Sequence, residues 1–225
     1  DGPMSRGLGD VYKRQEQSVP ILYDKKTKRI VNNESAEIIR MLDRHANALG
    51  ANMREQTYLY PEDDTLRNEI DILNKIIYTS INNGAYKAGF SFDQQIYAKA
   101  FYDYFQTLSE LEKKLAVDDR PFLTGANFTE ADLRLFPTLY RHDPIYYLRM
   151  KLNGAKILDY PHLWRWLCRV YALPGVAESN ALTHCKQGYF GRTWNKTIPV
   201  GPIKPMPYPS AYQHPELSNE RLTLK

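Results

Sequence analysis

The sequence predicts a small α/β domain followed by a larger all-helical domain and an extended tail. Short β-favouring runs surround a lysine-rich turn near residue 25, and apolar residues recur every three or four positions from residue 66 onward. Prolines then crowd the segment 198–209, which favours extended chain. With 225 residues, 43% hydrophobic and 25% charged, the chain has the composition of a globular protein with a sizeable buried core.

The first fifteen residues look foreign to the rest of the chain. They are rich in glycine and lack hydrophobic periodicity, and their run DVYKRQ is similar to the translation of a transposon-end adapter. We therefore expect residues 1–15 to be a non-native leader on a protein whose true start lies upstream, with a native disordered leader as the alternative. The other expected divisions are a partial α/β domain over 16–50, an all-helical domain over 51–185 and an extended tail over 186–225.

The α/β part begins with two predicted strands. Residues 19–23 (VPILY) and 29–31 (RIV) are β-favouring, and the charged turn 24–28 joins them as a hairpin. Glu34 and Ser35 then precede apolar residues at helical spacing, so a helix is expected to begin there. The predicted order is strand, turn, strand, helix.

The second part carries a helical pattern throughout. A polar linker at about 48–64 leads into a helix that we expect to end at the Asn-Asn-Gly sequence 82–84, and its apolar residues share one face. Thr129 and Asp132 fit a capping box at the start of a later helix. Further helices are predicted over 90–115, 163–171 and 174–182.

Charge and cysteine content argue against several classes of function. The net charge of +4 comes from the two ends, because residues 16–185 sum to −1, so no nucleic-acid partner is expected. No apolar run is long enough to span a bilayer and no secretory signal is visible, so we expect a cytoplasmic protein without a membrane partner. Cys168 and Cys185 lack metal-ligand spacing, and neither a disulfide nor a metal is expected.

Two motifs in the α/β part suggest a ligand site. In a thioredoxin-like domain a proline placed like Pro20 is often cis, which exposes the backbone of Val19 for pairing with a peptide-like ligand. Glu34 and Ser35 stand at a helix N-terminus, where they could bind the head group of an α-amino acid. Glutathione has both chemical features. The alternative is a purely structural role, because each motif alone is commonplace.

A resemblance to a known family runs along most of the chain. Residues 18–42 resemble the second half of the glutathione-binding domain of glutathione transferases, and most closely the omega-like Xi class, the glutathionyl-hydroquinone reductases. The likeness implies a partial thioredoxin-like α/β domain followed by the all-α C-terminal domain of a glutathione transferase. It continues in order through NNGAYKAGF (82–90), FLTGANFTEADLRLFPTLYRHD (122–143), DYPHLWRW (159–166), PGVAES (174–179) and IPVGP (198–202).

The resemblance implies a glutathione-dependent enzyme. In the family, a cysteine thiolate attacks the sulfur of a glutathionylated hydroquinone, the quinol leaves, and a second glutathione resolves the mixed disulfide. That cysteine belongs to a turn upstream of this chain, so we expect weak or no reductase activity from the chain as given. Glutathione is the implied co-substrate, quinone-derived molecules are the implied partners, and a homodimer is the implied assembly.

The glutathione site carries over residue by residue. Val19, beside a cis Pro20, would hydrogen-bond the cysteinyl part of glutathione through its backbone. Glu34 and Ser35 would hold the γ-glutamyl head. All four residues lie in the α/β part.

The quinone-derived substrate would lie against two tyrosines in the helical part. Tyr86 matches the family's Asn-Gly-x-Tyr-Lys stretch. Tyr189 is the second candidate, although its neighbours Gly188 and Phe190 depart from the family's His-Tyr-Tyr. Phenolic hydroxyls in this position can stabilise a leaving phenolate.

Two further readings of the function remain open. One is a non-catalytic transferase-like module for binding or assembly, and the other is a conjugating transferase that activates glutathione with serine or tyrosine. The tripeptide Arg141-His142-Asp143 looks like a catalytic trio, but successive helix positions do not face one another, so no site is expected there. Trp164 and Trp166 are expected to pack in the core.

Overall fold

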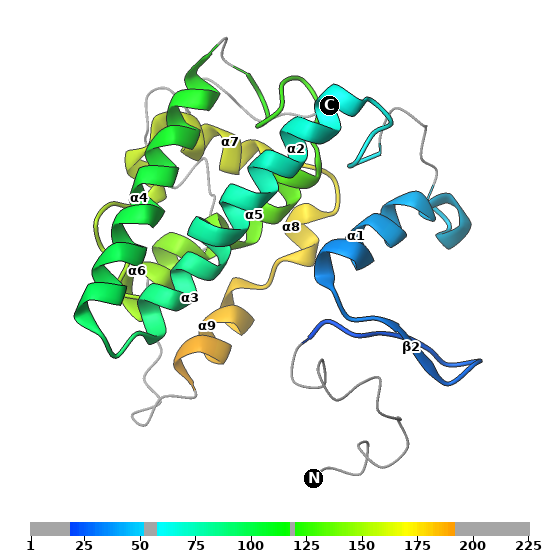
Figure 1. Ribbon diagram of the computed structural model, residues 1–225, viewed down its shortest axis with the longest axis horizontal. Helices are drawn as coiled ribbons and strands as arrows, with labels where there is room; N and C mark the ends of the chain where they lie inside the picture. The colour runs from blue at the N-terminus through cyan, green and yellow to red at the C-terminus, as the bar shows by residue number, and fades with distance from the viewer. Residues whose placement is uncertain (1–18, 52–57, 118–119, 192–225) are drawn as a thin grey trace. The chain divides into compact units, whose positions relative to one another are not determined.

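The computed structural model divides after Pro61 into two compact units, residues 1–61 and 62–225, which are described separately below. The structure describes residues 19–51, 58–117 and 120–191. The predicted leader and the IPVGP sequence therefore lie outside the described residues. The described elements, one hairpin and a series of helices, confirm the predicted fold class (Figure 1).

The first unit opens with the predicted hairpin. Strands β1 (Leu22–Asp24) and β2 (Arg29–Asn32) pair antiparallel, with Tyr23 opposite Ile30. The carboxylate of Asp24 holds the turn by accepting hydrogen bonds from the Lys26 backbone N–H at 2.8 Å and from the Thr27 hydroxyl at 2.6 Å. The charged turn is thus an Asx-type turn, as its composition favours.

Helix α1 (Ser35–Arg44) and the chain after it complete this unit. The Asp43 carboxylate accepts hydrogen bonds from the backbone N–H of Leu59 at 3.1 Å and of Tyr60 at 3.3 Å. The Arg40 guanidinium lies 3.7 Å from the centre of the Tyr60 ring. These contacts tie the segment up to Tyr60 to α1, so the unit extends past the predicted boundary at residue 50. A short 3-10 helix, η2 (Asn47–Leu49), follows α1.

The second unit starts with one continuous helical rod (Figure 1). It consists of α2 (Asp64–Ile76), the π-helical turn η4 (Ile77–Asn82) and α3 (Asn83–Phe90). The predicted end of the helix at 82–84 is therefore wrong. The Asn82 amide donates to the Arg134 carbonyl at 3.0 Å and to the Thr138 hydroxyl at 2.8 Å. Because a neighbouring helix satisfies this amide, it does not turn the chain locally.

Two more long helices surround the core of the second unit. Helix α4 (Gln94–Ala116) packs against α3 and α7 (Pro161–Tyr171), and α5 (Glu130–Arg141) packs against α2 and α7. The largest enclosed side chains are aromatic, among them Tyr104, Trp164 and Trp166. The prediction that both tryptophans pack in the core is confirmed.

The predicted capping box begins α5. The Asp132 carboxylate accepts hydrogen bonds from the Thr129 backbone N–H at 2.9 Å and the Thr129 hydroxyl at 3.1 Å. The same carboxylate reaches the Leu123 backbone N–H at 2.9 Å and the Trp166 indole N–H at 2.8 Å. One buried aspartate thus joins the start of α5 to the preceding loop and to α7.

The C-terminal helices differ from the prediction. A single helix over 174–182 is wrong, because α8 (Val176–Ser179) stops where the Asn180 amide donates to the Val176 carbonyl at 2.6 Å. Helix α9 (Leu182–Phe190) follows, so the predicted start of the tail at residue 186 falls inside a helix. Between α5 and α7 lie η6 (His142–Tyr146), α6 (Tyr147–Arg149) and η7 (Ile157–Asp159).

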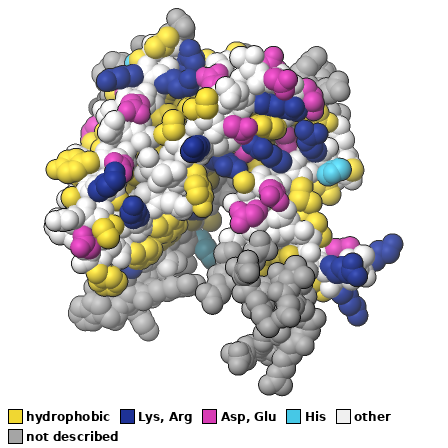
Figure 2. Space-filling view, viewed as in Figure 1, with side chains coloured by type: hydrophobic (Ala, Val, Ile, Leu, Met, Phe, Trp, Pro, Cys, Tyr) yellow, Lys and Arg dark blue, Asp and Glu magenta, His cyan; other side chains and the backbone are white. Residues whose placement is uncertain are grey.

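The surface carries charges of both signs. On the face shown in Figure 2, basic and acidic side chains alternate with hydrophobic ones over the described surface, and neither charge sign covers the face alone. None of the helices in the described part of the chain has the length and apolar character to cross a membrane.

Candidate functional site

The first group of predicted site residues lies ahead of the hairpin. The peptide bond between Val19 and Pro20 is cis, as expected from the sequence. Val19 is 88% exposed, and Pro20 lies two positions before the first strand. The backbone of Val19 therefore belongs to an open segment beside the sheet.

Glu34 and Ser35 stand together at the start of α1. Glu34 is the N-cap residue, and its backbone N–H donates to the Asn32 side chain at 2.7 Å. The Glu34 carboxylate does not cap the helix, and both side chains are exposed. Asn32 in turn donates to the Glu37 carboxylate at 2.5 Å, which fixes the loop before the helix. A free carboxylate and a hydroxyl thus flank the positive end of a ten-residue helix.

The second group forms a triangle of tyrosine hydroxyls within the helical unit. The hydroxyl oxygens of Tyr86 on α3 and Tyr189 on α9 are 2.6 Å apart. Tyr146, the last residue of η6, is 2.9 Å from Tyr189 and 3.3 Å from Tyr86 through its own hydroxyl. The structure thus brings the two predicted tyrosines into contact, although 103 positions separate them in the sequence, and adds a third that the sequence did not single out.

The triangle has an enclosed side and an open side. Tyr146 is 1% exposed, whereas Tyr86 is 38% exposed. The Tyr86 ring stacks on Phe90, with ring centres 5.9 Å apart. Arg149 connects Tyr189 to Phe90. Its Nε donates to the Tyr189 carbonyl at 3.2 Å, and its guanidinium lies 5.7 Å from the centre of the Phe90 ring. Of the three tyrosines, Tyr86 is the most exposed within the described chain, so a ligand could reach the hydroxyls from its side.

Burial keeps the inner hydroxyls protonated. Burial, together with the hydrogen bonds to Tyr189 and Tyr86, raises the pKa of Tyr146 well above its ordinary value. Burial also raises the pKa of Tyr189 to about 12, while Tyr146 and the positive charge of Arg141 act in the opposite direction. At neutral pH Tyr146 and Tyr189 therefore act as hydrogen-bond donors and not as phenolate bases.

Arg141 is the cation beside this cluster. Burial lowers its pKa, but the Tyr146 hydroxyl, Cys185 and Tyr189 outweigh burial and raise the pKa overall. The sequence did not single out Arg141, because this residue was considered only as part of the run Arg141-His142-Asp143. It also missed Tyr146, since nothing in the sequence distinguishes this residue among 17 tyrosines.

The run Arg141-His142-Asp143 forms no catalytic trio, as expected. His142 is buried, with its Nδ1 2.8 Å from the Tyr104 hydroxyl and its Nε2 3.0 Å from the Ala155 carbonyl. Asp143 accepts a hydrogen bond from the Ile157 backbone N–H at 2.7 Å. The three side chains face different partners.

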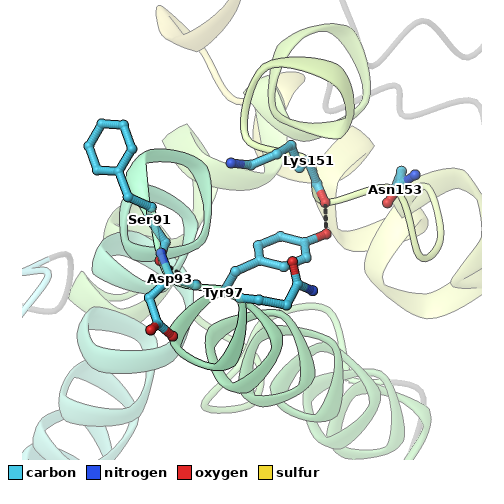
Figure 3. A pocket seen from close by; sticks show the side chains of 7 residues that line it. Ser91, Asp93, Tyr97, Lys151 and Asn153 are labelled. Carbon is cyan, nitrogen blue, oxygen red and sulfur yellow. Dashed lines mark hydrogen bonds between the residues drawn. The ribbon is translucent and has the colours of Figure 1, made fainter.

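A hollow of about 290 Å³ lies at the start of α4, and none of the predicted site residues lines it (Figure 3). Ser91, Asp93, Tyr97, Lys151 and Asn153 line it, and the Tyr97 hydroxyl closes one side by donating to the Lys151 carbonyl at 2.8 Å. Asp93 is already used as the N-cap of α4, with its carboxylate 2.8 Å from the Gln95 and Ile96 backbone N–H groups. Among residues 19–51, 58–117 and 120–191, no cluster of His, Cys, Asp and Glu could hold a metal.

Comparison with known proteins places the chain in a family. A family model described as "Glutathione S-transferase, C-terminal domain" matches residues 94–169. The chain is 43% identical over 194 residues to the glutathionyl-hydroquinone reductase PcpF of Sphingobium chlorophenolicum, an alignment that covers 84% of this chain and 60% of PcpF. The chain thus spans about three fifths of the length of this relative.

Solved structures agree in fold. The glutathione-bound YqjG of Escherichia coli K-12 matches with a TM-score of 0.75 and 41% identity, covering 83% of this chain and 60% of YqjG. The Xi glutathione transferase of Phanerochaete chrysosporium matches with a TM-score of 0.74 and 41% identity over the same shares of each chain. The chain belongs to the Xi class of the glutathione transferase family.

Proposed function

We propose that the protein removes glutathione from glutathionylated hydroquinones. The observation that carries the proposal is the triangle of Tyr86, Tyr146 and Tyr189, since grouped phenol hydroxyls can donate to an oxygen on which negative charge develops. The relatives named as glutathionyl-hydroquinone reductases support the choice of substrate.

The reaction needs a thiolate. In the proposed step, a cysteine thiolate attacks the glutathionyl sulfur, the carbon–sulfur bond breaks, and its electron pair and a proton give the hydroquinone. A second glutathione thiolate then attacks the mixed disulfide, which releases oxidised glutathione and restores the cysteine. Cys168 is 1% exposed in the core of the helical unit and is not accessible for this attack. The resemblance to the Xi class implies a nucleophile upstream of residue 19, in a longer chain, and we propose that position.

Glutathione would bind to the first unit. The backbone of Val19 would pair with its cysteinyl residue, beside the cis peptide bond. The Glu34 carboxylate would accept from the ammonium of the γ-glutamyl head, and the Ser35 hydroxyl and the first-turn N–H groups of α1 would donate to its carboxylate.

The hydroquinone would bind to the second unit. Tyr86 would donate directly to a phenolic oxygen and Tyr189 would support it by donating to Tyr86, which lowers the energy of the leaving group as its charge grows. Their contribution is hydrogen-bond donation and stabilisation of the developing charge.

The test is an assay for turnover of a glutathionyl-hydroquinone, monitored through the release of oxidised glutathione. The 225-residue chain should show little or none, and the protein extended by the coding sequence upstream of Ser18 should show it. In that extended protein, Tyr86→Phe should lower kcat about tenfold or more, because a donor used only in the transition state is lost. An extended protein that lacks a cysteine upstream, or that conjugates electrophiles without thiol transfer, would contradict the proposal.

A further inference from the structure

The inner tyrosine of the triangle cannot itself meet a substrate. Tyr146 is 1% exposed, and its hydroxyl lies 2.9 Å from that of Tyr189 and 3.3 Å from that of Tyr86. Tyr86 is the exposed member at 38%. Any influence of Tyr146 on a ligand must therefore pass through the other two hydroxyls.

The number of protons on each group sets the direction of the hydrogen bonds among the three hydroxyls. Each neutral phenol has one proton to donate and can accept as well. Tyr146 is buried, and its hydroxyl meets the hydroxyl oxygens of Tyr189 and Tyr86, so its proton is directed to one of these two. The shorter of its two contacts is the one to Tyr189, at 2.9 Å.

The next contact continues in the same direction. Since Tyr189 accepts from Tyr146, its own proton bridges the 2.6 Å contact to Tyr86. Tyr86 then accepts inside the triangle, and its proton is left for the open side. Each donor in such a series strengthens the next, most of all when the final acceptor is charged.

We propose that Tyr146 is a positioning residue of the phenol site, which orders a one-way series of donors from Tyr146 through Tyr189 to Tyr86 and so makes Tyr86 donate to a phenolate oxygen. This inference rests on the proposed function, because it assumes that the triangle receives a phenolic ligand. It adds a preference for the ionised ligand over the neutral one.

The probe is para-nitrophenol, whose phenolate absorbs visible light and whose two forms are both present near neutral pH. Binding to the 225-residue chain is measured across that pH range, which gives separate affinities for phenol and phenolate. Tyr146→Phe keeps the ring and removes the hydroxyl. It should weaken phenolate binding about 3- to 10-fold and leave phenol binding nearly unchanged, so the apparent pKa of the bound probe rises.

The matched control is Tyr140→Phe. Tyr140 is also 1% exposed, and its ring stacks on Tyr171 with centres 5.8 Å apart. Within the described part of the chain its hydroxyl has no hydrogen-bond partner. This variant should bind both forms of the probe as the unaltered chain does.

The outcomes separate the two proposals. If Tyr86→Phe leaves binding unchanged, the triangle is not a phenol site and the proposed function loses its support. If Tyr86→Phe weakens phenolate binding but Tyr146→Phe does not, or if Tyr146→Phe weakens both forms equally, the positioning role is overturned. Combining Tyr146→Phe with Tyr189→Phe should cost no more than Tyr189→Phe alone, and additive losses would overturn the series.

A second variant covers the case in which Tyr146→Phe does not fold. Tyr189→Phe breaks the same series one step further on and must also abolish the preference for phenolate. If the preference survives in Tyr189→Phe, the series does not exist.

Discussion

His142 lies buried just after the end of α5, and its two ring nitrogens face different partners. The Ala155 carbonyl can only accept, so Nε2 carries the proton, and Nδ1 accepts from the Tyr104 hydroxyl. A second proton would compete with that hydroxyl in a site without water contact. Burial accordingly lowers the pKa of His142 to about 4.

We expect His142→Phe to change how stability depends on pH. In the unaltered chain the unfolded state takes up a proton below its pKa of 6.5 while the folded state does not, so stability is lost as pH falls from 6.5 toward 4. His142→Phe should be the less stable protein at pH 7, because the Tyr104 hydroxyl loses its acceptor. Relative to the unaltered chain it should then gain about 3 kcal/mol by pH 4, measured by urea unfolding.

Tyr104→Phe is the control for this prediction. It removes the same hydrogen bond and keeps the imidazole, so it should retain the acid dependence. Burial also raises the pKa of the neighbouring Asp143 to about 6. The contribution of Asp143 to stability is therefore present at low pH and lost as pH rises through 6. Comparing variants that all keep Asp143 separates this effect from that of His142. A difference between His142→Phe and the unaltered chain that does not change with pH would contradict the prediction.

Ser35 tests the proposed glutathione site at the same scale. In the extended protein, Ser35→Ala should weaken glutathione binding by about 1 to 3 kcal/mol, since a charged carboxylate loses a donor. Calorimetry would measure the dissociation constant. Ser91→Ala is a matched control on the surface of the other unit, and an unchanged affinity in Ser35→Ala would remove Ser35 from the site.

At the scale of elements, the start of α5 depends on a single carboxylate. Asp132 accepts from the backbone N–H groups of Leu123 and Thr129 and from the indole of Trp166. Asp132→Ala would leave these donors buried without an acceptor. We expect a loss of roughly 3 to 5 kcal/mol in the free energy of unfolding, measured with denaturant.

Asp159 provides the control for the Asp132 prediction. It is exposed and accepts one backbone hydrogen bond, from Lys156 at 2.8 Å. Asp159→Ala should cost about 1 kcal/mol or less. Equal losses in the two variants would show that burial of the Asp132 network adds nothing to an ordinary cap.

Elements could be predicted from the sequence where the signal is local. The hairpin, the capping box at Thr129 and the apolar spacing of α2 depend on residues close together in the chain, and all three are present in the structure. The predicted helix end at 82–84 was wrong because the Asn82 side chain has a distant partner. Asn82 favours a turn in isolation, but Arg134 and Thr138 satisfy its amide across the helix pair.

The residues of the candidate site likewise fall into those that the sequence could predict and those that it could not. Tyr86 and Tyr189 were named because their sequence contexts resemble those of a family. Tyr146 could not be, since its position depends on a π-helical turn, η6, that the period of an ordinary helix does not indicate.

At the scale of the whole molecule, the apolar core is distributed unevenly. The large buried cluster lies entirely in the second unit, and Ile38 is the one buried apolar residue among the described residues of the first. A two-stranded hairpin and one helix bury too little to be stable alone. Most of the folding free energy should therefore belong to the helical unit.

Hydrogen exchange would measure this difference. Amides of β1, β2 and α1 should exchange through local opening at denaturant concentrations well below those that release α4 and α7. Release of both sets together would mean that the two units unfold as one, contrary to this expectation.

The π-helical turn η4 has a consequence for how such a protein can evolve by insertion and deletion of residues. A π-helical turn accommodates one more residue than an α-helical turn, and each residue of an α-helix turns the chain by about 100°. Deleting one residue within 77–82 would remove the residue that the wider turn accommodates, so a regular helix would still carry Tyr86, four positions beyond η4, toward its partners. The loss of a second residue has no wider turn to absorb it and would rotate Tyr86 by about 100° away from Tyr146 and Tyr189, in a chain that still contains all three tyrosines.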